Sequence, residues 1–389
     1  MGVAPRATLS PLLFAGFAVA SIGGPLALAA LYVPGAAGRA AALTTLAGVV
    51  VFAVPVAIWL RYSERIVSAG GLAAFVEAAA GRRAALAQGW IWTVSYFLYL
   101  PYTVTYIVYD VLAKVFPGIG SWRPVLEFAV PAGIVALVLL PLTRLLAGLL
   151  VVTIAQLGLV LVLGAVELTH AGVAAAGFSS PGGFDPGARA TAGVGLLFVC
   201  ASLPLFLGAE ARGGARTVRA SLAGAYAVVA AYVLFAALPL AGVPASLRGA
   251  ELPGVMIAQA YSGRALAVAV GLTAAASVTV LIVAEYLALS RLLHYLHGIP
   301  IRRALLAIAV PFVAADAVSL VDPNRFYDDL LKPSLAALFL SQLVVVALYP
   351  LFRRRVSERV GPVALGVAFV ASVLMGWGFY VAVTSSGGT

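Results

Sequence analysis

The sequence predicts an all-α polytopic membrane protein with about eleven transmembrane helices. Of its 389 residues, 63% are hydrophobic and only 10% are charged, and the mean hydropathy is +1.08. Soluble globular proteins carry roughly 25% charged residues, so this composition excludes a water-soluble fold. A transmembrane β-barrel would alternate apolar and polar residues, and the apolar runs at 134–142 and 151–166 do not alternate.

Apolar stretches long enough to cross a bilayer as a helix follow one another along the whole chain. They cover residues 11–33, 40–61, 84–115, 124–142, 145–168, 192–211, 220–241, 262–295, 303–320, 328–352 and 360–383. We expect a single transmembrane transporter domain over residues 1–389. Within it we expect one repeat at about 11–168, a second at about 192–352 and an extra helix at about 360–383. Because the first run continues to Val33, we interpret it as a span and not as a cleaved signal.

The basic residues between these spans predict the orientation. Of the 24 Lys and Arg residues, 16 fall on the side of the amino terminus and 8 on the other side. Cytoplasmic loops carry the excess of Lys and Arg. We therefore expect a multi-pass protein of the cytoplasmic membrane, with its amino terminus inside and its carboxyl terminus outside. The same loop charges explain the net charge of +10, so the lipid bilayer and no nucleic acid is the expected partner.

Residues that would support enzyme chemistry are sparse. The one cysteine, Cys200, lies in an apolar run, and the three histidines do not cluster with carboxylates. The sequence contains no Ser-His-Asp set, Walker loop or zinc motif. We therefore expect no enzyme activity, no resident cofactor and no metal site.

Glycine and proline interrupt the first and sixth spans, at Ser21–Pro25 and at Ser202–Gly208. Proline removes a backbone donor, and unpaired backbone groups exposed to lipid cost several kcal/mol each, so protein or water must receive them. The two spans are the first helices of successive five-helix sets, which run in opposite directions because five is odd. Broken helices at matching positions of inverted repeats are typical of a transporter binding site near the bilayer midplane. Ordinary kinks or close-packing glycines are the alternative.

The segment from Tyr62-Ser63-Glu64 through Ala69-Gly70-Gly71 to Val76, followed by Gly81 and Gly89-Trp90, resembles a signature of the amino acid–polyamine–organocation (APC) superfamily. Three further segments agree in order: Ile22-Gly23-Gly24, Phe206-Leu207-Gly208-Ala209-Glu210, and Ser290-Arg291 through Tyr295 to Pro300. The sequence departs from the pattern at Arg212–Arg216, at Tyr295, which is one residue late, and in having eleven spans instead of twelve. The resemblance implies a 5+5 inverted-repeat permease fold with helices 1 and 6 broken, and an amino acid or related amine as the small-molecule substrate.

The broken helices suggest how such a substrate would bind. The first amides of the outer half of helix 1, near Gly23 and Gly24, carry the positive end of the helix dipole and suit a carboxylate. Freed carbonyls near Ser21 and Ser202 suit an ammonium group. An α-amino acid supplies both charges. The expected substrate-binding residues are Ser21, Ile22, Gly23, Gly24, Tyr99, Ser202, Leu203, Phe206 and Gly208.

Tyrosines at positions 99, 102, 106 and 109 recur at helical spacing and would share one face of span 3. One or two of these rings would cover the substrate opposite Phe206, which we expect to act as a gate. Aromatic packing or an interfacial belt is the alternative. Tyr109 and Asp110 are expected at the outer interface.

Carboxylates inside a membrane are costly and default to functional candidates. We expect Glu210 to be linked to Arg212, Arg216 or the Tyr62–Arg65 loop, or to take part in coupling. Glu285 is expected either to pair with Arg291 or a neighbouring loop or to carry protons. Asp316 is expected to be solvated or paired near the outer end of its span, and Glu127 and Glu167 to be interfacial.

The coupling ion is expected to be H⁺ or Na⁺. Span 8 offers the hydroxyls of Ser277 and Thr273 on one face, and span 5 places Gln156 where proton-coupled relatives often have a lysine. The sodium ligand set is incomplete, which favours proton coupling or exchange through Glu210 or Glu285. Because no acidic residue in the sequence flanks either break on the pocket side, we expect a neutral, apolar or aromatic amino acid. The alternatives are a carrier of an amine, a polyamine or another solute, and a non-transporting sensor or subunit.

Overall fold

The computed structural model describes residues 7–23, 38–180 and 182–384 of the chain. Within these residues the regular secondary structure is helical, apart from one parallel β-bridge between Leu9 and Ala211. The described secondary structure therefore confirms the all-α class.

The helices follow the apolar spans closely. The first half of the chain contains α1 (Pro11–Gly23), η1 (Gly38–Ala40), α3 (Ala41–Ser63), α4 (Gly71–Ala80), α5 (Arg82–Thr105), η2 (Tyr106–Leu112), α6 (Ala113–Val115), η3 (Pro117–Trp122), α7 (Arg123–Val138), α8 (Leu142–Ala171) and η4 (Ala175–Phe178). The second half contains α9 (Phe184–Val199), η5 (Cys200–Glu210), α10 (Gly214–Ala237), η6 (Leu240–Gly242), α11 (Ala245–Arg248), α12 (Pro253–Ser262), α13 (Arg264–His297), α14 (Ile301–Val318), α15 (Pro323–Ala347), α16 (Tyr349–Arg355) and α17 (Pro362–Thr384).

In the described part of the chain, eight helical stretches are long and apolar enough to cross a membrane. The other expected spans contain α1, the α5–α6 stretch and α14. The short helices α4 and α12 lie between the expected spans. The protein is therefore a multi-pass helical membrane protein.

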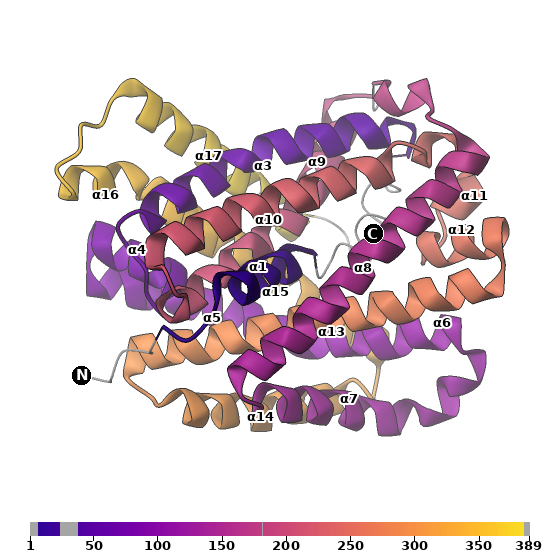
Figure 1. The fold of residues 1–389 in the computed structure, drawn as a ribbon, viewed down its shortest axis with the longest axis horizontal. Helices are drawn as coiled ribbons and strands as arrows, with labels where there is room; N and C mark the ends of the chain where they lie inside the picture. The colour runs from indigo at the N-terminus through magenta and orange to yellow at the C-terminus, as the bar shows by residue number, and fades with distance from the viewer. Residues whose placement is uncertain (1–6, 24–37, 181, 385–389) are drawn as a thin grey trace.

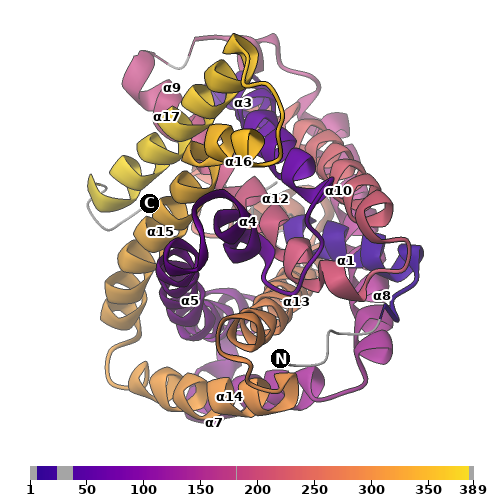
Figure 2. The ribbon, with the colours of Figure 1, turned by 90° about the vertical axis from the view of Figure 1, so that its left-hand side faces the viewer.

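Helix α13 lies at the centre of the bundle. Figure 2 shows α4, α5 and α13 between α15 and α17 on one side and α1, α8 and α10 on the other. Every residue of α13 from Val280 to Leu292 is buried. A helix that is apolar on all sides is buried on all sides, so the two charged residues inside this stretch must find partners within the protein.

The sixth span changes its helix type in the middle. The α-helix α9 ends at Val199, and the chain continues as a 3₁₀-helix, η5, that contains Pro204. It then extends at Ala211 and turns at Gly213, whose φ is +87°, before α10 begins. A 3₁₀ stretch inside a span is typical of a hinge or of a strained sequence. The predicted interruption at Ser202–Gly208 therefore takes the form of a tightened helix.

Helix α1 packs against α8, α10, α13 and η5, so the first and sixth spans meet at the centre of the molecule. Figure 1 shows α1 between α10 and α13, with α8 crossing the bundle obliquely. The predicted interruption of the first span begins inside α1, but Gly24 and Pro25 lie outside the described residues.

Candidate functional site

A buried ion pair joins the end of η5 to α13. The Nε of Arg291 donates to Oε1 of Glu210 at 2.9 Å, and these residues are 4% and 6% exposed. Arg291 also donates to the Ser290 hydroxyl at 3.1 Å and to the Leu287 carbonyl at 3.3 Å. This pairing corrects two expectations: Glu210 contacts neither Arg212 nor Arg216 in an ion pair, and Arg291 does not pair with Glu285.

Leu9, which precedes α1, forms backbone hydrogen bonds with the end of η5 next to this ion pair. The Leu9 amide donates to the Glu210 carbonyl at 2.9 Å, and the Arg212 amide donates to the Leu9 carbonyl at 2.9 Å. Spans 1, 6 and 8 are thus tied together at the end of the bundle where α1 begins.

The Gly70-Gly71 pair of the family-like motif also contacts spans 6 and 8. A Cβ on Gly70 would come within 2.6 Å of the Tyr295 ring, and one on Gly71 would come within 2.6 Å of the Phe206 ring. Gly71 also has a φ of +49°, which favours glycine. The Tyr295 hydroxyl in turn donates to Glu77 of α4 at 2.6 Å. The two glycines therefore let the loop before α4 pack directly against the two rings.

Phe206 is part of a buried aromatic cluster between η5 and α5. Its ring centroid lies 4.3 Å from that of Trp92, which lies 4.0 Å from that of Tyr96. Tyr99 and Tyr102 continue the row, with their centroids 4.9 Å apart. Phe206, the expected gate, is 1% exposed, so its ring is held between Trp92 and the Gly71 backbone.

The tyrosine row does not continue along one face as an α-helix would place it. From Tyr106 the span becomes a π-helix, η2, which holds more residues per turn. Tyr102 and Tyr106 both pack near Tyr327 of α15, whereas the Tyr109 ring lies under the Arg123 guanidinium at 4.6 Å. Tyr109 therefore faces α7, away from the row.

Glu285 of α13 is fully buried, and neither of its carboxylate oxygens has a hydrogen-bond partner. It is close enough to Tyr96, Tyr99 and Tyr102 of α5 to interact with them electrostatically. It interacts in the same way with Cys200, the first residue of η5. We expected no acidic residue on the pocket side of the break. Glu285 corrects this expectation, because α13 brings a carboxylate near η5 from a span far away in the sequence.

An amide and a hydroxyl add polar groups to the same segment. Gln342 of α15 donates from Nε2 to the Ser202 hydroxyl at 3.1 Å, and Ser202 donates to the Val199 carbonyl at 3.0 Å. Both residues are fully buried, and Oε1 of Gln342 has no partner. Gln342 was not among the expected site residues. The signal for it in the sequence is an amide next to Ser341 inside the apolar stretch 335–348.

The remaining substrate-binding candidates lie on the elements that meet at the centre. Ser21 and Ile22 are fully buried near the end of α1, and the Ser21 hydroxyl donates to the Phe17 carbonyl at 2.8 Å. Leu203 is fully buried in η5. Gly208 packs against Val67, 3.3 Å from the position of its missing Cβ. Gly23 is the last residue of α1, and Gly24 lies outside the described residues.

The three hydroxyl and amide candidates for coupling lie on two neighbouring helices, α8 and α13. Ser277 is fully buried on α13, and Thr273, one turn earlier, is half-buried. Gln156 is 1% exposed on α8, which packs against both α1 and α13. Thr279 donates instead to the Ala275 carbonyl at 2.9 Å and faces α7. All three candidates lie on helices that pack against α1.

Three acidic residues that were expected near water are fully buried. Glu127 of α7 and Asp316 of α14 lie next to each other and near Ser319, and Glu167 of α8 lies near Tyr261 of α12. The solvated alternative for Asp316 is therefore wrong, and Glu127 and Glu167, at span ends, are covered by other helices. Helix contacts exclude water at these span ends, which the linear pattern did not reveal.

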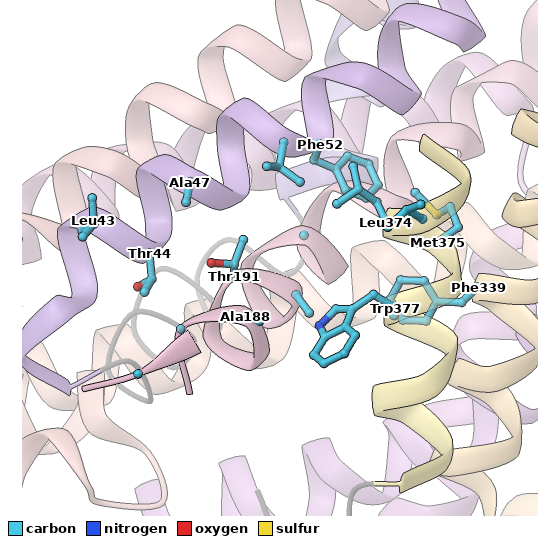
Figure 3. A pocket seen from close by; sticks show the side chains of 17 residues that line it. Leu43, Thr44, Ala47, Phe52, Ala188, Thr191, Phe339, Leu374, Met375 and Trp377 are labelled. Atoms are coloured by element: carbon cyan, nitrogen blue, oxygen red, sulfur yellow. The ribbon is translucent and has the colours of Figure 1, made fainter. Parts of the chain in front are cut away.

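A separate apolar cavity of about 500 Å³ lies between α3, α9, α15 and α17. Figure 3 shows the Trp377 indole pointing from α17 toward Ala188 and Thr191 of α9. No charged residue lines this cavity among the described residues, and none of the predicted site residues does. It therefore lacks the counter-charges that a zwitterion or a cation would require.

No protein-family model and no curated protein sequence matches this chain. Several solved structures are similar to it in fold. MhsT in complex with L-phenylalanine aligns with a TM-score of 0.68 at 14% identity, covering 98% of this chain and 100% of that one. Mhp1, a nucleobase-cation-symport-1 family transporter with bromovinylhydantoin bound, aligns with a TM-score of 0.59 at 16% identity over 98% and 92%.

These similarities concern the fold, since the sequence identities are low. Both neighbours are transporters of the LeuT fold, which is built from inverted repeats. The continuous helical spans, the interrupted sixth span and the coverage of nearly the whole chain all agree with that architecture. The chain therefore has the LeuT transporter fold.

Proposed function

We propose that the protein is a secondary active transporter that moves an amino acid or a related amine by alternating access. The observation that carries the proposal is the meeting of the interrupted sixth span with α1, α5 and α13 around Phe206, Tyr99 and Glu285. A scaffold or sensor would have no need to change helix type in the middle of a buried span. The whole-chain similarity to two transporters supports the same class.

The proposed binding site comprises the end of α1, the start of η5 and the aromatic cluster on α5. The substrate carboxylate would meet the first amides of the outer half of helix 1, which follows Gly23 and lies outside the described residues, and the ammonium group would lie near Ser21, Ser202 and Leu203. Tyr99 and Phe206 would cover it, while Ile22 and Gly208 would shape the backbone around it. The similarity to a transporter solved with L-phenylalanine supports a substrate of this size.

Two substrate classes fit this site. A neutral, apolar or aromatic amino acid would pack against Trp92, Tyr99 and Phe206. A cationic amine is favoured by a specific observation: the Glu285 carboxylate is buried near this cluster without a hydrogen-bond partner. The APC-like motif is compatible with either class.

We place the protein in the cytoplasmic membrane with its amino terminus inside, following the loop charges. The repeats would be 11–168 and 192–352, with 360–383 as an additional helix. Coupling would use protons or exchange in preference to sodium, because Ser277 and Thr273 are few ligands for a metal ion. Uptake that requires sodium and is lost in Ser277→Ala would contradict this preference.

The test begins with purified protein and a panel of amino acids and amines. Ligands that bind the folded state raise the thermal unfolding temperature, and those that do so should then be taken up by proteoliposomes. Phe206→Ala should reduce uptake at least tenfold. Phe312→Ala, which removes an equally buried ring from α14, should reduce stability without a comparable loss of uptake per folded molecule. Binding without uptake under any ion gradient would support a non-transporting sensor, and the absence of both would contradict the proposal.

A further inference from the structure

Glu285 is the starting point because it is a fully buried carboxylate without a hydrogen bond beside the interrupted sixth span. The other charged residue in the buried stretch of α13, Arg291, is already bound to Glu210. Six residues separate Arg291 from Glu285, which is a rise of about 9 Å along the helix.

The groups that interact electrostatically with Glu285 supply no positive charge. They are Tyr96, Tyr99 and Tyr102 of α5 and Cys200 of η5, and both elements pack against α13. The described part of α1 contains no ionisable side chain.

The charged groups on the other helices that pack against α13 are either exposed, as Arg83, Arg144, Arg302 and Arg303 are, or lie near other partners. Glu127 of α7 and Asp316 of α14 interact with each other, and Lys114 of α6 pairs with Glu251. Asp110 of η2 lies near Lys114 and Arg123. Glu167 of α8 interacts with Tyr261 of α12. In the described part of the chain, no cationic side chain therefore forms a hydrogen bond with Glu285.

A carboxylate in such a place must be neutralised. An isolated charge in a low-dielectric interior costs far more than any single hydrogen bond returns, so the group takes up a proton or pairs with a cation. Because the two occupants use the same carboxylate, they exclude each other. The site is then neutral with a proton alone, or with a monocation alone.

The surroundings favour an organic cation as the second occupant. The faces of tyrosine, tryptophan and phenylalanine rings attract ammonium groups, and Trp92, Tyr96 and Phe206 form a continuous cluster here. The Tyr96 hydroxyl is buried without a hydrogen bond and offers an acceptor oxygen. A zwitterion on ionised Glu285 would leave one net negative charge buried, whereas a monocationic amine leaves none.

We propose that Glu285 binds a proton and the ammonium group of a monocationic amine in alternation, so that the protein exchanges amine for proton. This inference rests on the proposed transport function and specifies its substrate class and coupling. When the amine binds, protonated Glu285 releases its proton, and the ammonium pairs with the carboxylate near Tyr96 and Tyr99. The amine leaves on the other side when a proton returns.

Proton release on binding tests the proposal directly. Phenethylamine, a monocation with an aromatic ring, is titrated into detergent-purified protein by calorimetry in two buffers of different ionisation enthalpy. We expect about one proton released per amine bound. We also expect the affinity to rise about tenfold per pH unit while Glu285 is protonated in the empty site. L-Phenylalanine, the zwitterion of similar size, should bind at least tenfold more weakly.

Variants separate this site from the other buried acids. Glu285→Gln should abolish proton release and the pH dependence, and Glu285→Asp should retain both with weaker binding. Glu167→Gln, a change of the same kind at an equally buried residue on α8, should behave as wild type. If Glu285→Gln does not yield monodisperse protein, the Glu285→Asp and wild-type titrations still decide the question.

Three results would overturn the inference: proton release that survives in Glu285→Gln, amine binding without proton release, or no binding of the amine. Phenylalanine binding accompanied by proton uptake would indicate a proton symporter of zwitterions instead. In that case, and whenever proteoliposomes take up an amino acid independently of Glu285, the proposed transport function stands and only the inference fails.

Discussion

Glu210 and Glu285 are both buried carboxylates of the central helices, and they differ in what faces them. Glu210, at the end of η5, receives a hydrogen bond from Arg291 at 2.9 Å, and its own backbone carbonyl binds the Leu9 amide. Glu285, on the same helix as Arg291, faces tyrosines and a thiol and accepts no hydrogen bond. The comparison teaches that the partnered acid, Glu210, holds three spans together, whereas Glu285 makes no hydrogen bond to any other span in the described part of the chain.

Breaking the ion pair between Arg291 and Glu210 should produce the largest loss of stability. Arg291→Met leaves Glu210 buried without its partner, and removing one member of a buried pair typically costs about 3–5 kcal/mol. We expect this loss in reversible denaturant unfolding of the detergent-solubilised protein. The double variant Glu210→Leu with Arg291→Met should recover most of it, because no uncompensated charge is left. A loss that persists in the double variant would mean that the pair does not act as a unit.

Substitution of Glu285 should show the opposite pattern, a large loss of transport with little loss of stability. Glu285→Gln removes the exchangeable charge, so transport should fall about 100-fold, which corresponds to about 2.7 kcal/mol. Its unfolding free energy should stay within about 1 kcal/mol of wild type or rise, since a neutral amide replaces an unpaired buried acid. Transport is measured as amine uptake into proteoliposomes against an imposed pH gradient. A stability loss as large as that of Arg291→Met would make Glu285 a structural residue.

Gly71→Ala sharpens the comparison at the aromatic cluster. The new Cβ would lie 2.6 Å from the Phe206 ring at a φ of +49°, and we expect a loss of about 1–2 kcal/mol from the backbone alone. Gly298→Ala is the control, because Gly298 is also left-handed, with a φ of +70°, and has open space around its Cβ position, so it isolates the backbone cost. Transport per folded molecule should fall in Gly71→Ala and persist in Gly298→Ala. Equal transport in both would show that the position of Phe206 is unimportant.

The Gln342–Ser202 bond is expected to contribute less stability than the Arg291–Glu210 pair. Ser202→Ala removes a buried acceptor and should cost about 1–3 kcal/mol if the Gln342 amide finds no other partner. Adding Gln342→Leu should restore part of the loss, because both polar groups are then absent. The double-variant cycle is measured by the same unfolding experiment. Additive losses would indicate that the two side chains do not interact.

The span ends could be predicted closely because lipid imposes a simple rule on the chain. Spans predicted at 40–61 and 262–295 correspond to α3 at Ala41–Ser63 and α13 at Arg264–His297. The interruption of span 6 was also foreseeable, because Pro204 and Gly208 weaken the helix locally. The π-helix from Tyr106 to Leu112 was not, since its residues suit an ordinary α-helix.

The partners of the ionisable residues were the least predictable feature. Sequence spacing offered Arg291 as one partner for Glu285 and left Asp316 solvated or paired, whereas Arg291 binds Glu210 and Asp316 is fully buried next to Glu127. Within one helix, spacing ranks nearby pairs, but the groups that meet at the bundle centre come from spans far apart in the sequence. Gln342 and Ser202, 140 residues apart, are an example.

The amino-acid sequence alone determined the membrane environment, the helical class and the place of the sixth interruption, because hydropathy and backbone chemistry act locally. Only the tertiary structure decided that Glu210 pairs with Arg291 while Glu285 accepts no hydrogen bond. It also decided that Gly70 and Gly71 lie against aromatic rings. Those outcomes depend on how α5, η5 and α13 pack against one another. A charge buried in that packing is stabilised only by the groups that other helices bring to it.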